Sequence, residues 1–277
     1  MVGVFLGGVS SLLYGVGDFL GGEGAKRVSA ATVVLWAGMV SIPLITVFAL
    51  LVGGEASARD LRIGASAGSA GAFGLVTLFA GLSKGQAAAV APAAAVLSGV
   101  FPLSVAVMSG ERLSGLDWVG VSVAVPAIVL CSWVAHPGEV PFGGLWYGLA
   151  AGLGFGGYTI FINLTSDGSG LLPLIPARLA TMLVVAVLAM ARVWTVSSFA
   201  TSPRWIIIGN GLLDVSGNVA LLLALRVGTL ARISIAASFY PAVTVLMARL
   251  FNAEHLAPRQ VAGLALTLVA LGAIAVG

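Results

Sequence analysis

Three polar residues at helical spacing interrupt a long apolar segment in the second half of the sequence. Asn210, Asp214 and Asn218 are four residues apart, inside a mostly apolar run from 205 to 226. This spacing places all three on one side of a helix. An aspartate at the centre of a membrane costs about 3 kcal/mol on insertion scales, so this side should face protein or water rather than lipid. The stripe therefore predicts either the lining of a polar cavity or a set of hydrogen bonds between helices.

Other apolar segments carry polar residues of the same kind. Asp18 comes one helical turn after Tyr14, and it is either a cavity residue or an interfacial acid that pairs with Lys26 or Arg27. Polar residues also recur in the predicted helices near 144–165 and 229–251. The candidate residues of the cavity are Tyr14, Asp18, Tyr158, Asn163, Asn210, Asp214, Asn218, Ser238 and Tyr240.

The acids in apolar segments, Asp214 and Asp18, are the candidate coupling residues, with Asp214 the stronger. A carboxylate in an apolar site can take up a proton on one side of a membrane and release it on the other. A cationic or zwitterionic solute could compete for the same group. Arg178 could pair with Asp214 or extend its long side chain to the membrane interface, and its place near the start of a helix favours the interface.

The composition places these residues in a membrane. The chain has 277 residues, of which 59% are hydrophobic and 8% charged, and its mean hydropathy is +1.10. Soluble proteins have about 25% charged residues, so this surface requires lipid as its solvent. A spanning helix needs about 20 apolar residues, and the runs lack the alternation of barrel strands. We therefore predict an all-α polytopic membrane protein with ten helices, at 2–21, 30–52, 62–83, 87–109, 116–135, 144–165, 171–192, 205–225, 229–251 and 259–276.

The second half of the sequence repeats the first. At a constant shift of 143 residues, "SGERL" at 109–113 aligns with "NAEHL" at 252–256, and Gly120 aligns with Gly263. The chain thus divides into five helices over 1–135, a linker over 136–143 and five helices over 144–277. Because five is odd, the second half must enter the membrane with the opposite orientation. Inverted repeats of this kind are typical of transporters, whose solute site lies in a central cavity between the repeats.

Short motifs near the end of each half are similar to those of a known family. The first half has "GERL" at 110–113, and the second half has Pro241 in the helix that precedes Glu254. The first half has Ser98 where the second has Pro241, with Pro102 nearby. On these motifs the chain resembles the ten-helix EamA-type branch of the drug/metabolite transporter superfamily. The resemblance implies a solute exporter that uses no ATP, with helix bends near its gates. It also implies both termini in the cytoplasm, and we expect the plasma (inner) membrane of a bacterium.

Motifs for other kinds of protein are missing from the sequence. It contains no G-x-x-x-x-G-K-[ST] loop for ATP and no H-E-x-x-H pair for zinc. The single cysteine, Cys131, leaves no partner for a disulfide. We expect no enzymatic activity, no cofactor or metal, and no nucleic-acid partner.

The predicted function is secondary transport of small metabolites or drug-like solutes by alternating access. Protons are the candidate coupling ion, through Asp214 or Asp18, and Pro102 and Pro241 are the candidate bends beside the gates. Membrane lipids surround the chain, and we favour a monomer over an obligate oligomer. The alternatives are a facilitator without coupling, a channel, or a membrane scaffold that transports nothing.

Overall fold

Helices make up almost all of the structure. The computed structural model describes residues 1–83, 87–132, 142–193, 195–251 and 257–277, and within them every regular element is helical. The prediction of an all-α fold is confirmed. The helices are α1 (Val2–Ala25), α2 (Ala30–Val52), α3 (Ala58–Ser83), α4 (Ala87–Met108), α5 (Gly115–Ser132), α6 (Phe142–Asn163), α7 (Leu174–Met190), α8 (Arg204–Val227), α9 (Leu230–Ala237), α10 (Tyr240–Phe251) and α11 (Pro258–Val276), with short 3-10 turns η1 (Asp167–Ser169) and η2 (Phe199–Thr201).

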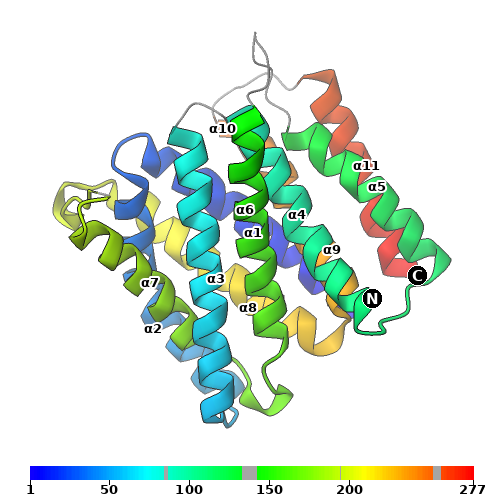
Figure 1. The fold of residues 1–277 in the computed structure, drawn as a ribbon, viewed down its shortest axis with the longest axis horizontal. Coiled ribbons are helices and arrows are strands. Elements are labelled where there is room, and N and C mark those ends of the chain that lie inside the picture. Colours follow the sequence, from blue (N-terminus) through cyan, green and yellow to red (C-terminus); the bar gives the residue numbers. More distant parts are fainter. Residues whose placement is uncertain (84–86, 133–141, 194, 252–256) are drawn as a thin grey trace.

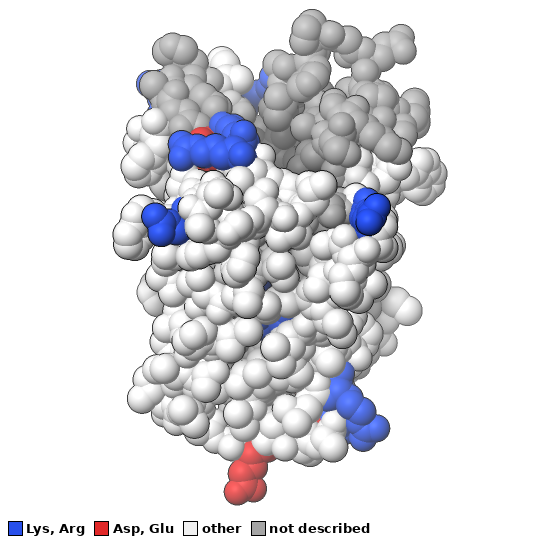
Figure 2. Space-filling model, turned by 90° about the vertical axis from the view of Figure 1, so that its left-hand side faces the viewer, with Lys and Arg blue, Asp and Glu red and all other residues white. Residues whose placement is uncertain are grey.

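The helices have the length and composition of membrane spans. Among the described residues, seven helical segments are long and apolar enough to cross a membrane, and three apolar helices are shorter. Large apolar side chains face outward, for example Leu50 at 75% and Leu183 at 63% exposure. Figure 2 shows a broad band with almost no charged residues between the charged ends of the molecule. The chain is therefore a multi-pass membrane protein.

One predicted helix is divided in the structure. The sequence predicts a continuous helix over 229–251, whereas α9 ends at Ala237 and α10 begins at Tyr240. Pro241 accounts for the break, because its ring has no N–H and would clash with the carbonyl of Ala237, four residues earlier. Pro102 behaves differently: α4 stays helical through it, and Pro102 packs against Gly156 of α6.

Glycines allow several helices to approach one another closely. A Cβ at Gly154 of α6 would lie 2.5 Å from the Cα of Gly74 in α3, and one at Gly68 of α3 would lie 1.9 Å from the carbonyl oxygen of Ala177 in α7. Larger residues could not occupy these positions without separating the helices. Figure 1 shows the resulting arrangement, in which α6 lies against α3 and α4, α1 lies against α8, and α5 pairs with α11.

Both termini lie at the same side of the bundle, here called the terminal side (Figure 1). The connections 53–57, 109–114, 164–173 and 228–229 lie there too. The Glu55 N–H donates to the carbonyl of Gly168 at 2.8 Å, and Gly277 packs beside Ser114. The connections 26–29 and 191–203 lie at the opposite side, where Trp36 Nε1 donates to the carbonyl of Ser197 at 2.9 Å.

Candidate functional site

A cavity of about 1160 Å³ occupies the centre of the bundle. Helices α1, α2, α3, α4, α6, α7, α8, α9 and α10 all contribute to its wall. The wall continues to Gly22, Lys26 and Val193, which are exposed at the opposite side. No residue of the connections at the terminal side lines it. The cavity therefore opens toward one side only.

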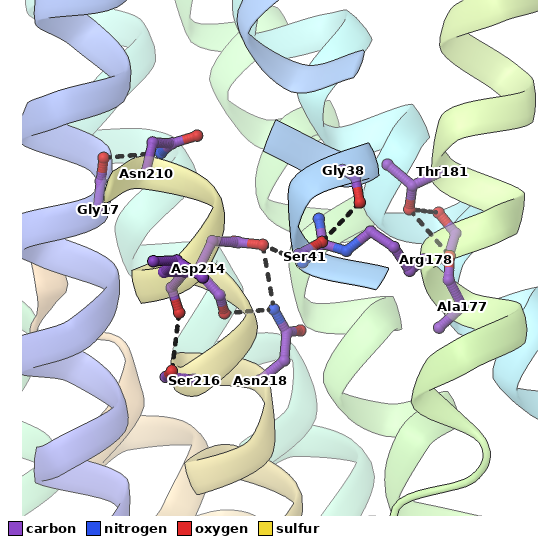
Figure 3. Close-up of polar contacts among 12 residues, drawn as sticks. Gly17, Gly38, Ser41, Ala177, Arg178, Thr181, Asn210, Asp214, Ser216 and Asn218 are labelled. Carbon is purple, nitrogen blue, oxygen red and sulfur yellow. Dashed lines mark hydrogen bonds and ion pairs between the residues drawn. The ribbon is translucent and has the colours of Figure 1, made fainter. Parts of the chain in front are cut away.

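An ion pair between α7 and α8 crosses this cavity. Arg178 Nη2 donates to Asp214 Oδ2, and the Arg178 side chain is only 13% exposed (Figure 3). The prediction that Arg178 extends to the interface is therefore wrong. The reason is the close approach of α7 to α3 at Gly68, which turns this part of α7 inward, and the Arg178 stem then passes Gly38 of α2.

The ion pair continues into a chain of hydrogen bonds. Asn218 Nδ2 donates to the carbonyl oxygen of Asp214 at 2.7 Å, and it lies 3.4 Å from Asp214 Oδ2. Tyr158 Oη of α6 donates to Asn218 Oδ1. Three consecutive helices, α6, α7 and α8, are thus joined by one polar network. The Asp214 side chain is 34% exposed, and a solute cation that binds Oδ2 must compete with the Arg178 guanidinium.

The third member of the stripe, Asn210, joins α8 to α1. Its Nδ2 donates to the carbonyl oxygen of Gly17 at 2.8 Å (Figure 3), and the residue also lines the cavity. Both interpretations of the stripe therefore apply at this position, since the side chain forms an interhelical hydrogen bond and borders the cavity. The side chain also lies close to Gly21, where a Cβ would be 3.0 Å from Asn210 Nδ2.

The polar residues of α1 also face the cavity. Tyr14 and Asp18 both line it, and Asp18 is exposed there. Asp18 forms no hydrogen bond or ion pair with any of the described residues. Lys26, its predicted interfacial partner, instead pairs with Glu23 at 2.6 Å. Because α1 continues to Ala25 rather than ending near residue 21, Asp18 lies almost two turns from the helix end.

The remaining candidates divide into residues inside and outside the cavity wall. Ser238 and Tyr240 line the cavity at the break between α9 and α10, beside Pro241. Ser238 Oγ donates to the carbonyl of Ile235 at 2.8 Å, as suits a hydroxyl at a helix end. Asn163 is the last residue of α6 at the terminal side and is not part of the wall. Its assignment to the cavity is wrong, because the helix carries it past the cavity floor.

The structure adds a set of contacts that the sequence analysis does not identify as functional, here called the terminal-side seal. Arg232 Nη2 of α9 donates to Asp117 Oδ2 of α5 at 2.8 Å. The Ala231 N–H donates to Glu111 Oε1 at 3.2 Å, and the Ser166 N–H donates to Asp60 Oδ1 at 2.8 Å. Each contact joins residues of 1–135 to residues of 144–277. A sequence signal exists for the acids: Ser57-x-x-Asp60 and Ser114-x-x-Asp117 resemble capping boxes at helix starts.

Comparisons with known proteins bear on the fold alone. No protein-family model matches the chain, and no curated protein matches it significantly. Solved structures do match. One of them, described only as "Crystal structure of protein", is 15% identical, with a TM-score of 0.72 over 98% of this chain and 95% of that chain. At this identity the match shows that the same helical architecture occurs in another protein over its nearly complete length.

Proposed function

We propose that this chain is a secondary transporter that carries a small solute across the membrane by alternating access. Its spans would number ten, with α9 and α10 together forming the ninth, in two inverted repeats over 1–135 and 144–277. The single observation that carries the proposal is the central cavity, which opens at one side and has no residue of the terminal-side connections in its wall. A carrier needs a solute site that one side can reach while the other is closed.

The packing of the helices supports the inverted repeat. In that arrangement the first and third spans of one repeat correspond to α6 and α8 of the other. Helix α1 packs along α8, and its counterpart α6 packs along α3. Likewise α2 packs along α8 and its counterpart α7 along α3, while α5 and α11, the last spans of the repeats, pack against each other. Such exchange of partners is what a two-fold axis in the membrane plane requires.

The seal favours a carrier over a channel or a scaffold. A conducting channel needs a continuous path, whereas here buried Asp60 and Asp117 hold the repeats together below the cavity. A scaffold needs no large cavity open to one side. Alternating access requires the seal to break while the opposite side closes, and its few hydrogen bonds are of a strength that a bound solute can offset.

We further propose the plasma membrane of a bacterium as the location, with the termini in the cytoplasm. The structure would then be open to the outside, as an exporter is after releasing its solute. Asp214 pairs with Arg178, whereas Asp18 forms no ion pair with any described residue, so we propose Asp18 as the more accessible coupling group. Reporter fusions at Gly277 test the orientation.

A counterflow experiment tests the proposed function. Purified protein in liposomes is loaded with an unlabelled solute chosen by a thermal-shift screen of metabolites and organic amines, and entry of the labelled solute is followed. A carrier gives a transient, saturable accumulation above equilibrium. A channel gives linear, non-saturable entry, and a scaffold gives none, so either result rejects the proposal. Protein-free liposomes serve as the inactive control.

A further inference from the structure

The charged residues around the cavity are not balanced. Those that line it in the described part of the chain are Asp18, Lys26, Arg178 and Asp214. Arg178 pairs with Asp214, and Lys26 pairs with Glu23. Asp18 has no counter-charge among the residues that the structure describes. An unpaired charge in a membrane protein is unfavourable and marks a binding site by default.

The packing of α1 fixes Asp18 in this position. One face of α1 lies on α10, where a Cβ at Gly15 would lie 2.6 Å from the carbonyl oxygen of Tyr240. Another face lies on α8, where a Cβ at Gly21 would lie 3.0 Å from Asn210 Nδ2. On a helical wheel Asp18 falls between these two faces, on the side of Tyr14. The carboxylate is therefore presented to the cavity by a helix held on both flanks.

The wall around this carboxylate suits an apolar body. Alanine, valine and leucine form much of it. Four aromatic rings also contribute, from Tyr14, Phe155, Tyr158 and Tyr240. Rings of this kind attract organic cations through their electron-rich faces. The volume of about 1160 Å³ slightly exceeds the range of about 300–1,000 Å³ for small-molecule pockets, so the cavity can hold a bulky solute.

We propose that the transported solute is an organic cation with an apolar body, whose positive group binds Asp18. This inference rests on the proposed function and names the solute class of the same cavity. The solute supplies the counter-charge that Asp18 lacks, while the aromatic and aliphatic wall takes up its apolar part. The Arg178–Asp214 pair stays closed in this scheme and links α7 to α8 across the cavity.

Two ions of one shape and opposite charge test the inference directly. Tetraphenylphosphonium and tetraphenylborate are equilibrated with the full chain in lipid nanodiscs, and binding to protein-free nanodiscs is subtracted. We expect saturable binding of the phosphonium only. In the Asp18→Asn variant its dissociation constant should rise about 10- to 100-fold, the range for loss of one charge-assisted contact. Asp18→Glu should keep the charge selectivity.

The matched control is Glu55→Gln, which removes an exposed carboxylate at the terminal side, away from the cavity. Its binding should equal that of the unaltered chain. Equal binding of both ions, no saturable binding, or phosphonium binding that Asp18→Asn leaves unchanged would each overturn the inference. Thermal unfolding shows whether the Asp18→Asn variant is folded. If it is not folded, loss of the preference for the phosphonium ion over the borate ion in the folded Asp18→Glu variant overturns the inference as well.

Counterflow of the labelled phosphonium separates this inference from the proposed function. Saturable counterflow that persists in Asp18→Asn keeps the carrier and removes the cation site. Binding that depends on Asp18 without any counterflow keeps the cation site and removes the carrier.

Discussion

Breaking the contact between Asp117 and Arg232 should open the terminal side. The pair joins α5 to α9, with Nη2 and Oδ2 at 2.8 Å and the side chains 1% and 30% exposed. A hydrogen bond to a charged group contributes about 1.5–3 kcal/mol. Because Arg232 is partly exposed, we take the lower value, about 1.5 kcal/mol, which corresponds to about a tenfold change in the equilibrium between sealed and open forms.

The Asp117→Asn substitution isolates this contribution. The Ser114 N–H donates to Asp117 Oδ2 at 2.8 Å, and an amide oxygen can accept the same bond. The start of α5 should therefore stay capped, while the charged partner of Arg232 is lost. Asp167→Asn is the matched control, because Asp167 is 88% exposed and its contact with Arg226 is long, at 3.4 Å. Exposed pairs of this kind contribute little.

A single cysteine reports the opening. Ser11→Cys, in a Cys131→Ser background, places a thiol on α1 one turn below Tyr14, where Ser11 is 3% exposed and its hydroxyl has no hydrogen-bond partner among the described residues. A membrane-impermeant maleimide is added at the terminal side of oriented vesicles. We expect Asp117→Asn to raise the labelling rate about tenfold, and Asp167→Asn to leave it within about twofold. Equal rates for all three proteins would refute the assignment of this pair to the seal.

Three further predictions follow from contacts inside the bundle. Arg178→Gln or Asp214→Asn alone should lower the free energy of unfolding by about 1–3 kcal/mol, because each single change leaves the partner's charge unpaired. The double variant should lose less than the sum of the two single losses. Thermal unfolding in detergent measures these losses, and additive losses would contradict the pairing. Gly68→Val should abolish the monodisperse peak in size-exclusion chromatography, since its Cβ would lie 1.9 Å from the Ala177 carbonyl oxygen; a normal peak would show that α3 and α7 can separate. Ser29→Ala should cost about 1 kcal/mol by removing the cap of α2, and an unchanged unfolding temperature would contradict that role.

The sequence predicts the helices well because their signal is local. Long apolar runs end at connections rich in polar residues, glycine or proline, and most predicted helices coincide with a helix of the structure. A bend at Pro241 is predicted from the sequence, whereas the structure has a complete break between α9 and α10 before it. Pro43 and Pro126 lie inside unbroken helices, so a proline alone does not decide between a bend and a break.

The cavity residues were harder to predict, because their partners lie in other helices. The stripe of Asn210, Asp214 and Asn218 could be identified as inward-facing from its spacing and cost alone. The direction of Arg178 depends on how closely α7 approaches α3, which no pattern in α7 encodes. Asn163 shares a polar character with the cavity residues, but its depth along α6 is set by where that helix begins. Depth and pairing are tertiary properties, and the periodicity of one helix does not contain them.

The partners of α1 have a consequence for how the protein is made. Ser10 Oγ donates to the carbonyl of Gly217 across 207 residues of sequence, and α1 rests against α8, α9 and α10. Helix α1 leaves the ribosome before these partners and must therefore wait in the bilayer, without most of its native neighbours, until they have been synthesised. A fragment that stops after the first repeat should insert into membranes yet remain unassembled. Adding the missing second repeat as a separate chain should then let the early helices complete their fold.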